Sequence, residues 1–311
     1  MAITQEHVSL KLVEGFLLHC SARNLSLHTL HAYRTDLSQF VTFSGEEARV
    51  DRRLVRRFLV HLHDAGLKPI SMKRKLAAVK SFCRWLEAEG YLEAGLIDFV
   101  ANRYRRDELP DVPTEGEVKR LLGGDLLQHS RPGCVSQKPE RDRLVLELLY
   151  GCGLRASELV DINCDDFQGE DVLLIRGKGK KERQVIVGEY ARDALKAWLP
   201  VRRNLLHRMH LKTPALLVAM GRGKLTERLD TRSVRRIVKT AAETSGLDPK
   251  QWHPHLLRHA MATHMCDRGA PLQAVSQLLG HAKLSTTQVY TRVSVGRMMR
   301  TFRAAHPHAQ R

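Results

Sequence analysis

Residues 252–259 read WHPHLLRH, and this stretch sets the expectation for the second half of the chain. In a helix that begins after the proline, His255 and Arg258 fall on one face at i and i+3, with His259 beside them at i+4. Two histidines four residues apart also have the spacing of a zinc site of the HExxH kind. Here two leucines and Arg258 fill the intervening positions, which removes the glutamate base and puts a cation beside the metal. The sequence therefore disfavours zinc.

A second stretch, residues 277–290, reads QLLGHAKLSTTQVY and ends on a tyrosine. Gly280 is typical of a helix end, so His281 would follow that helix directly. Ser285 is typical of an N-cap, with a glutamine three residues later completing a capping box, and Tyr290 then projects from the second turn of the new helix. A lone tyrosine on a helix is more often structural, so Tyr290 indicates a function only in combination with other chemically active residues.

Two further clusters place cations beside glycines. Residues 151–159, GCGLRASEL, allow a tight turn and put Arg155 where a helix begins, with a guanidinium suited to bidentate donation to phosphate. Residues 176–183, RGKGKKER, form a cationic turn between two β-rich runs and lack the order of a nucleotide-binding loop. Taken alone, each cluster also fits an ordinary solvated surface. Together, two arginines, a lysine, two histidines and a tyrosine form a coherent set for phosphoryl transfer.

The composition points in the same direction. The chain has 311 residues, and 51 lysines and arginines against 34 aspartates and glutamates give a formal charge of +17. Such an excess attracts polyanions, and duplex DNA carries one negative charge per about 1.7 Å of its axis. Net charge alone also fits a basic protein kept soluble by its charge, so the motifs must decide.

Neither a membrane nor an oxidising compartment is indicated. No window approaches the roughly 18 continuous apolar residues of a membrane span, and the first residues lack a secretory signal. The six cysteines are scattered, with no C-x-x-C pair, which favours free buried thiols over a zinc ribbon or a disulfide framework. We therefore expect a soluble, cytoplasmic protein with no membrane partner.

Residues 1–103 read as a helical bundle. Apolar residues recur at spacings of three and four over residues 30–40, and again over residues 54–62 after Asp51, a predicted N-cap. Ser71 is predicted to cap a further helix that stops at Gly90. The other face of that helix is basic, and we expect it to contact DNA phosphates, the alternative being a solvated face. Its cations are Lys73, Arg74, Lys75, Lys80 and Arg84.

The remaining chain is predicted as a linker, a second domain and a tail. Residues 104–113 are charged, contain two prolines and show no periodicity, which is typical of a linker. The second domain, residues 114–294, begins at a capping box of Thr114 and Glu117. It is mainly helical, with one hairpin whose turn carries Lys178, Lys180 and Lys181 and is suited to pushing a lysine into a DNA groove. Residues 295–311 form a terminal helix and tail.

These clusters together resemble the tyrosine recombinases, with the Xer-type members nearest. The resemblance rests on residues 153–159, 177–179, 255–259 and 279–281, closing on Tyr290, and it spans nearly the whole chain. Each motif is modest alone, but their order and spacing are specific. The chain departs from many relatives at Cys152 and Ala156, in a long loop at residues 123–139, and in lacking an Asn-Pro at the end of the first domain.

The resemblance implies a mainly α fold, with an N-terminal SAM-like, core-binding helical bundle and a mixed α/β catalytic domain with a small β-sheet. It implies that Tyr290 attacks a scissile phosphate to give a 3′-phosphotyrosine and a free 5′-hydroxyl. Arg155 and Arg258 would clamp the non-bridging oxygens, and Lys178 would protonate the leaving oxygen. His255 and His281 would assist by proton transfer or hydrogen bonding, with neither ATP nor metal required.

The resemblance also implies partners and an assembly. The partner is double-stranded DNA with specific recombination sites, bound in a homo-tetramer or a hetero-tetramer with a second recombinase, on the bacterial nucleoid. The terminal helix is expected to be donated to a neighbouring protomer, the alternative being a helix packed on its own core. A type IB topoisomerase, a catalytically silent DNA-binding protein and, last, a zinc hydrolase built on His255 and His259 remain as alternatives.

Overall fold

The computed structural model describes residues 9–45, 50–93, 95, 112–123, 139–177, 182–221, 224–226, 228–280 and 292–309. The chain divides into two units, residues 1–109 and 110–311, each with its own apolar core. The division falls inside residues 104–113, the predicted linker, which lies mostly outside the described residues and stays a prediction. Helices dominate both units, which confirms the mainly α fold.

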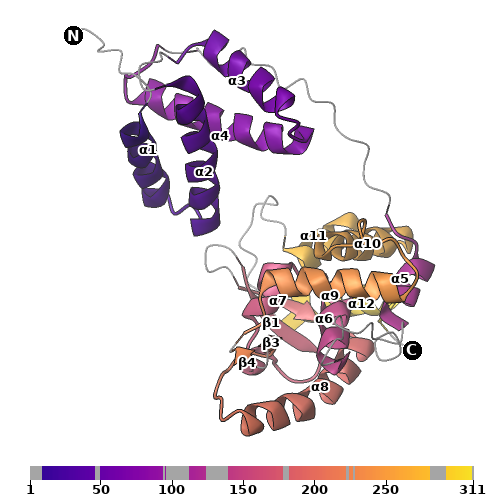
Figure 1. The fold of residues 1–311 in the computed structure, drawn as a ribbon. Helices are drawn as coiled ribbons and strands as arrows, with labels where there is room; N and C mark the ends of the chain where they lie inside the picture. The colour runs from indigo at the N-terminus through magenta and orange to yellow at the C-terminus, as the bar shows by residue number, and fades with distance from the viewer. Residues whose placement is uncertain are drawn as a thin grey trace. The chain divides into compact units, whose positions relative to one another are not determined.

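The first unit is a bundle of helices (Figure 1). They are α1 (Leu10–Ala22), α2 (Leu27–Ser44), α3 (Arg52–Asp64) and α4 (Pro69–Ala88). The Asp51 carboxylate caps α3 by accepting a hydrogen bond from the Leu54 amide at 2.6 Å, as predicted. The predicted start of α4 at Ser71 is wrong, because Pro69 occupies the first helical position, where its fixed φ suits a helix and its missing N–H costs nothing.

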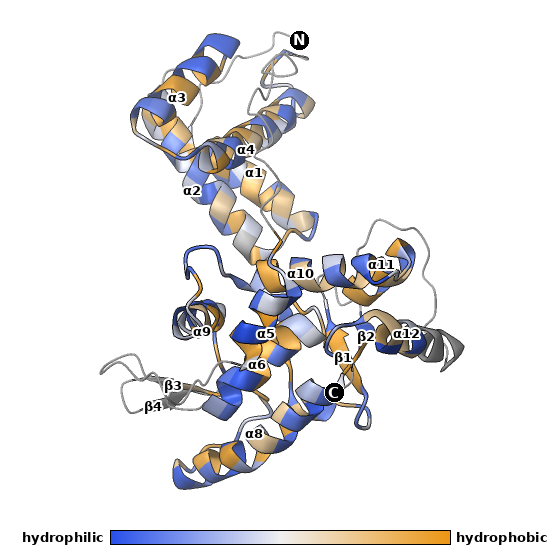
Figure 2. Ribbon diagram, turned by 90° about the vertical axis from the view of Figure 1, so that its right-hand side faces the viewer, coloured by the Kyte–Doolittle hydropathy of each residue, from blue (hydrophilic) through white to orange (hydrophobic). Residues whose placement is uncertain are grey.

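An aromatic core holds this bundle together. Phe16, Phe40, Phe58 and Phe82 come from the four helices and are almost completely buried. Phe16 and Phe82 meet edge to face with ring centroids 5.5 Å apart, and Phe40 and Phe58 do so at 5.1 Å. Hydrophilic and hydrophobic residues separate along α3 and α4 (Figure 2), so burial of one face of each helix fixes the bundle.

The predicted basic face of α4 loses one member in the structure. Lys75 is 5% exposed, and its Nζ lies 2.9 Å from Oδ1 of Asp36 on α2 and also contacts Gln39. It follows Met72 by three positions and precedes Val79 by four, so it belongs to the apolar stripe of the helix. The prediction that Lys75 lies on the DNA-facing surface is therefore wrong.

The other cations of α4 lie nearer the solvent. Lys73 and Arg84 are exposed, Lys80 is half-buried, and Arg74 is half-exposed while it pairs with Asp36. Their contact with DNA phosphates remains a prediction.

The second unit places helices around a small antiparallel hairpin (Figure 1). Its elements are α5 (Glu115–Gly123), α6 (Pro139–Gly151), α7 (Ala156–Asp161), a 3₁₀ turn (Cys164–Asp166), β1 (Val172–Arg176), β2 (Glu182–Ile186), α8 (Glu189–Arg208), β3 (Ala219–Gly221), β4 (Lys224–Thr226), α9 (Thr231–Thr244), α10 (Pro254–Asp267), α11 (Leu272–Leu279) and α12 (Arg292–Ala305). The capping box before α5 is confirmed, since Thr114 and Glu117 exchange hydrogen bonds of 2.8 and 3.2 Å.

The predicted hairpin is confirmed. β1 and β2 pair antiparallel from Val172 opposite Ile186 to Arg176 opposite Glu182. Leu173, Ile175 and Val185 face the core, as the two-residue period of a half-buried strand requires. The turn with Lys178, Lys180 and Lys181 lies outside the described residues. So do residues 124–138, where the long loop is predicted.

The cysteines of the described residues agree with the expectation of free thiols. The described cysteines are free thiols, with Cys20, Cys83 and Cys152 buried. Burial raises the pKa of the Cys152 thiol to about 12, which leaves it inert at neutral pH. Among the described helices, none is both long enough and apolar enough to cross a membrane.

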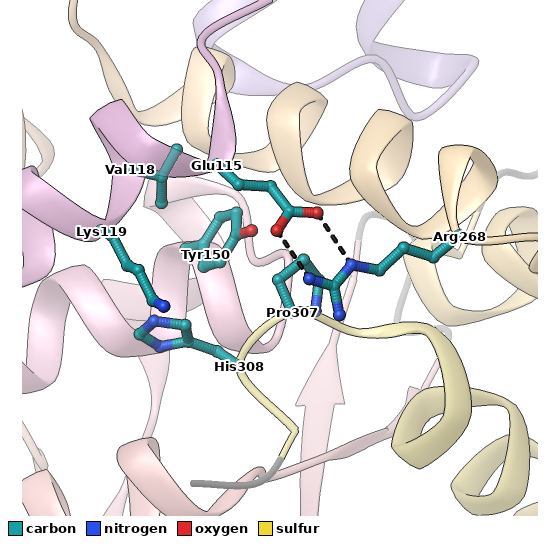
Figure 3. Close-up of a pocket in the computed structure, with 7 residues that line it drawn as sticks. All are labelled: Glu115, Val118, Lys119, Tyr150, Arg268, Pro307 and His308. Atoms are coloured by element: carbon teal, nitrogen blue, oxygen red, sulfur yellow. Dashed lines mark hydrogen bonds and ion pairs between the residues drawn. The ribbon is translucent and has the colours of Figure 1, made fainter.

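The C-terminal helix packs on the core of its own chain. Met298 and Phe302 of α12 are buried in the same core as the hairpin. His306 and His308 follow into the interior, where the ring of His308 stacks on Tyr190 at 4.2 Å. Figure 3 shows Pro307 and His308 lining a pocket with Tyr150 and with Glu115 and Arg268, which form an ion pair. Exchange of residues 295–311 between protomers stays a prediction.

The docked tail makes stability depend on pH. Burial lowers the pKa of His306 to about 3 in the folded protein, whereas an unfolded imidazole titrates near about 6.5. The unfolded chain therefore takes up a proton that the folded chain refuses. The contribution of His306 is fully present above about pH 6.5 and falls as the pH drops below that value.

We expect the melting temperature of His306→Gln to fall less than that of the parent protein as the pH is lowered from about 7 to about 5. The measurement is a thermal unfolding series across that range. His207→Gln, which changes an exposed histidine of α8, should leave the profile as in the parent protein. Identical slopes for the parent and His306→Gln would contradict a neutral, buried His306.

Candidate active site

The start of α7 presents Arg155, as predicted. Gly153 adopts a φ of +60°, and a Cβ there would lie 2.9 Å from a methyl group of Leu279, so the tight turn requires glycine. Arg155 is the N-cap residue of α7, and its backbone amide donates to Oε2 of Glu158 at 2.9 Å. Its guanidinium donates to Oε1 of the same carboxylate at 2.7 Å, and its side chain is 37% exposed. The guanidinium is thus anchored on one side and open to solvent on the other.

The start of α10 presents His255 and Arg258. The helix begins at Pro254, one position earlier than predicted, and Nδ1 of His253 caps it by accepting a hydrogen bond from the Leu256 amide at 3.0 Å. His255 is exposed, whereas Arg258 is 6% exposed. Burial, then the charges of His255 and Arg235, lower the pKa of His253.

Arg258 joins two segments that are far apart in the sequence. Its guanidinium donates to the carbonyl of Gly153 at 2.6 Å and to the carbonyl of Leu279 at 2.6 Å. Leu279 is the last residue of α11, and Gly280 ends that helix with a φ of +66°, as predicted. Arg258 therefore holds together the turn before Arg155 and the helix end before His281.

The carboxylate of Glu158 lies among three arginines. Glu158 binds Arg155, accepts hydrogen bonds of 2.9 and 2.8 Å from Arg183 of β2, and lies 3.8 Å from a guanidinium nitrogen of Arg258. Burial opposes its ionisation, but the hydrogen bonds and charge of Arg183, then the hydrogen bonds of Arg155, outweigh burial and lower the pKa of Glu158 to about 2. The carboxylate is ionised at any physiological pH.

Sequence reasoning missed Glu158 and Arg183 as site residues. Glu158 belongs to the motif around Arg155, and its position at i+3 in the first turn of a helix is a recognisable signal. Arg183 shares the inward face of β2 with Val185, and a charged side chain on the apolar face of a strand indicates a buried partner.

The cluster carries an excess of positive charge. Three guanidinium groups, from Arg155, Arg183 and Arg258, face a single carboxylate, leaving two uncompensated charges among these described residues. Burial and the neighbouring Arg155, with a smaller effect of Arg183, lower the pKa of Arg258 to about 10, so it stays protonated at neutral pH. Such a cluster is suited to bind an anion with planar, charge-assisted hydrogen bonds, as a phosphate group accepts.

The structure thus brings Arg155 and Arg258 together and leaves His255 on the exposed start of the same helix as Arg258. Lys178, His281 and Tyr290 lie outside the described residues, as do Lys180 and Lys181. Of the predicted catalytic residues that the structure describes, Arg155, His255 and Arg258, none lines the pocket of Figure 3. Within the part of the chain that the structure describes, no three histidine, cysteine or acidic side chains are grouped to hold a metal.

Family models match both units of the chain. Residues 117–297 match the phage integrase family, and residues 13–90 match the SAM-like N-terminal domain of phage integrases. These matches cover most of the chain and include every predicted catalytic residue.

Known proteins resemble the chain over nearly its full length. Tyrosine recombinase XerC of Chlorobaculum tepidum is 38% identical over 94% of each chain. Tyrosine recombinase XerD of Bifidobacterium longum is 34% identical over 96% of this chain and 97% of its own.

Two solved structures share the fold. The XerH site-specific recombinase bound to its difH substrate has a TM-score of 0.67 at 20% identity, covering 97% of this chain and 91% of its own. The lambda integrase tetramer bound to a Holliday junction has a TM-score of 0.65 at 17% identity, covering 92% and 77%. The chain therefore belongs to the phage integrase family of tyrosine recombinases, and it is Xer-like.

Proposed function

We propose that this protein is a site-specific DNA recombinase that cuts and rejoins duplex DNA through a 3′-phosphotyrosyl bond to Tyr290. One observation carries the proposal: Arg155 and Arg258 meet at Glu158, while Arg258 also binds the helix end two residues before His281. Two guanidinium groups held in this way present donors to the two non-bridging oxygens of one phosphate. Their charge stabilises the further negative charge that builds up in the transition state.

The reaction is a transesterification. The Tyr290 hydroxyl forms a bond to phosphorus, the bond from phosphorus to the 5′-oxygen breaks, and Lys178 gives that oxygen its proton. A tyrosine has a reference pKa of about 10, so it needs nearby positive charge to react as a phenolate. His255 and His281 assist by taking up the phenol proton or by hydrogen bonding to the phosphate. The phosphotyrosine retains the energy of the phosphodiester, so the family works without ATP or metal.

We propose double-stranded DNA with specific recombination sites as the partner, bound by a tetramer of this chain or of this chain with a second recombinase. The similar lambda integrase is a tetramer bound to a Holliday junction, and the similar XerH recombinase is bound to a DNA substrate. In this assembly residues 295–311 would pass to a neighbouring protomer instead of packing within one chain. Recombination would take place on the bacterial chromosome in the cytoplasm.

A type IB topoisomerase would share the nucleophile but act without a partner site, and the matched relatives do not favour it. A catalytically silent DNA-binding protein would lack covalent chemistry.

A suicide substrate with a nick near the cleavage site tests the proposal. The short fragment that carries the 5′-hydroxyl diffuses away after cleavage, so religation cannot occur and the covalent complex accumulates. We expect a protein–DNA adduct that survives denaturation. Tight binding without any adduct would favour the silent binder.

Lys178→Ala tests the general acid. We expect cleavage of an ordinary site to slow by about 10²–10⁴-fold, because the 5′-oxygen must leave without a proton. A substrate with sulfur at the bridging 5′ position has a leaving group that needs no proton. Its cleavage by Lys178→Ala should approach the parent rate, in single-turnover gel assays. An equal loss on both substrates would remove Lys178 from this role.

A further inference from the structure

Arg183 is a buried cation to which the proposed reaction assigns no role. It follows the hairpin turn on β2 and is 7% exposed. Two of its guanidinium nitrogens donate in parallel to the two oxygens of Glu158, at 2.9 and 2.8 Å. Both terminal nitrogens of Arg183 are thus engaged within the protein. Its partner within the cluster is the carboxylate.

The carboxylate that Arg183 binds is the one that orients Arg155. Each oxygen of Glu158 accepts from both arginines, since Oε1 takes the Arg155 guanidinium at 2.7 Å and Oε2 takes the Arg155 amide at 2.9 Å. Two parallel hydrogen bonds fix the plane of a carboxylate as well as its position. Without them a buried carboxylate would turn or take up a proton, because burial disfavours the charged form.

Arg183 also packs against the helix end that precedes His281. A Cβ at Gly280 would lie 2.6 Å from Cδ and 2.9 Å from Nε of Arg183, so the side chain of Arg183 lies directly against the backbone there. The same helix end is bound by Arg258 through the Leu279 carbonyl. Arg183 thus contacts the end of α11, and through Glu158 the start of α7, from the strand that follows the turn with Lys178.

We propose that Arg183 is a positioning residue for DNA cleavage: it keeps Glu158 ionised and oriented, and through Glu158 it aligns Arg155 on the scissile phosphate. The inference rests on the proposed function, because it assigns Arg155 to the phosphate. In this role Arg183 acts on the phosphate through Glu158 and Arg155. Its removal should slow cleavage and leave DNA binding almost intact, since the surface cations remain.

The experiment measures single-turnover cleavage of the nicked suicide substrate by the full chain. We expect Arg183→Gln to cleave about 10²-fold more slowly, the loss typical of a misplaced catalytic group. The matched control is Arg203→Gln, which changes an exposed arginine of α8 and should cleave at the parent rate. Dissociation constants and melting temperatures are measured for each variant alongside the rate.

A pH profile separates positioning from a general loss of stability. In Arg183→Gln the pKa of Glu158 should rise, so Glu158 takes up a proton and releases Arg155 as the pH falls. The rate of Arg183→Gln relative to the parent should therefore drop between about pH 8 and about pH 5.5. Adding Glu158→Gln should abolish this drop and slow cleavage no further than the slower single variant, because both changes break one interaction.

Arg183→Lys keeps the inference testable if Arg183→Gln does not fold. It keeps the buried charge but donates from a single point, so we expect a stable protein that cleaves about tenfold more slowly. Folded Arg183→Gln or Arg183→Lys cleaving as fast as the parent would overturn the inference. So would additive losses with Glu158→Gln and a flat relative pH profile. Absence of any adduct in the parent protein would instead overturn the proposed function.

Discussion

Tyr290→Phe is expected to bind its DNA site as the parent protein does and to form no covalent complex with it. The substitution removes one oxygen atom, the one that would bond to phosphorus, and keeps the ring. Loss of a nucleophile costs about 10⁴–10⁶-fold in rate, so the adduct on a nicked substrate should fall below detection. Gel-shift titration measures binding, and denaturing gels measure the adduct.

Tyr190→Phe is the matched control. Tyr190 stacks on His308 in the second unit, and phenylalanine preserves that ring contact. The control should trap DNA at the parent rate. Adduct formation by Tyr290→Phe at a comparable rate would show that another group attacks the phosphate.

Arg258→Lys is expected to produce the second largest loss. Arg258 binds two carbonyls from separate segments at 2.6 Å each, and a guanidinium has five N–H donors, so it can also serve a phosphate. The ammonium of lysine keeps the charge but cannot span these acceptors in one plane. We expect cleavage to fall about 10²–10³-fold, the usual loss when a donor to a transition state is removed.

Arg258→Ala should add a loss of stability. It leaves the Gly153 and Leu279 carbonyls without their donor and removes a cation near Glu158, which costs about 1–3 kcal/mol in free energy of unfolding. Urea titration measures this cost.

Arg268→Lys is the control for Arg258→Lys, because Arg268 also forms two hydrogen bonds, to Glu115, but on an exposed part of the same unit. Parent-like cleavage by Arg258→Lys would contradict a role for Arg258 at the phosphate.

Much of the fold follows from local patterns in the sequence. Apolar spacings of three and four predict α2 and α3, Asp51 is correctly predicted as an N-cap, and the alternation around the glycine turn predicts the β1–β2 hairpin. These features depend on residues within one or two turns of each other, which a single sequence displays. Glycine at position 280 likewise marks a helix end, because the chain closes the helix there in the left-handed conformation, which glycine adopts without strain.

The errors about charged residues come from partners far away in the sequence. Lys75 resembles a surface cation because its partner, Asp36, lies on another helix, although its place in the apolar stripe is a signal of its burial. The grouping of Arg155 and Arg258 follows from a family resemblance, since local spacing cannot bring residues 103 positions apart together. Arg183 belongs to a cationic turn in the sequence, and only the pairing of β1 with β2 shows that it points inward to Glu158.

The identity of the residue that becomes joined to DNA is the most direct test of the proposed reaction. Digestion of the trapped complex with trypsin and nuclease should yield the peptide of residues 284–292, LSTTQVYTR, which contains Tyr290 as its one tyrosine. We predict that fragmentation of this peptide by mass spectrometry places the nucleotide on Tyr290. A nucleotide on one of its serine or threonine residues, or on any other peptide, would contradict the proposed reaction.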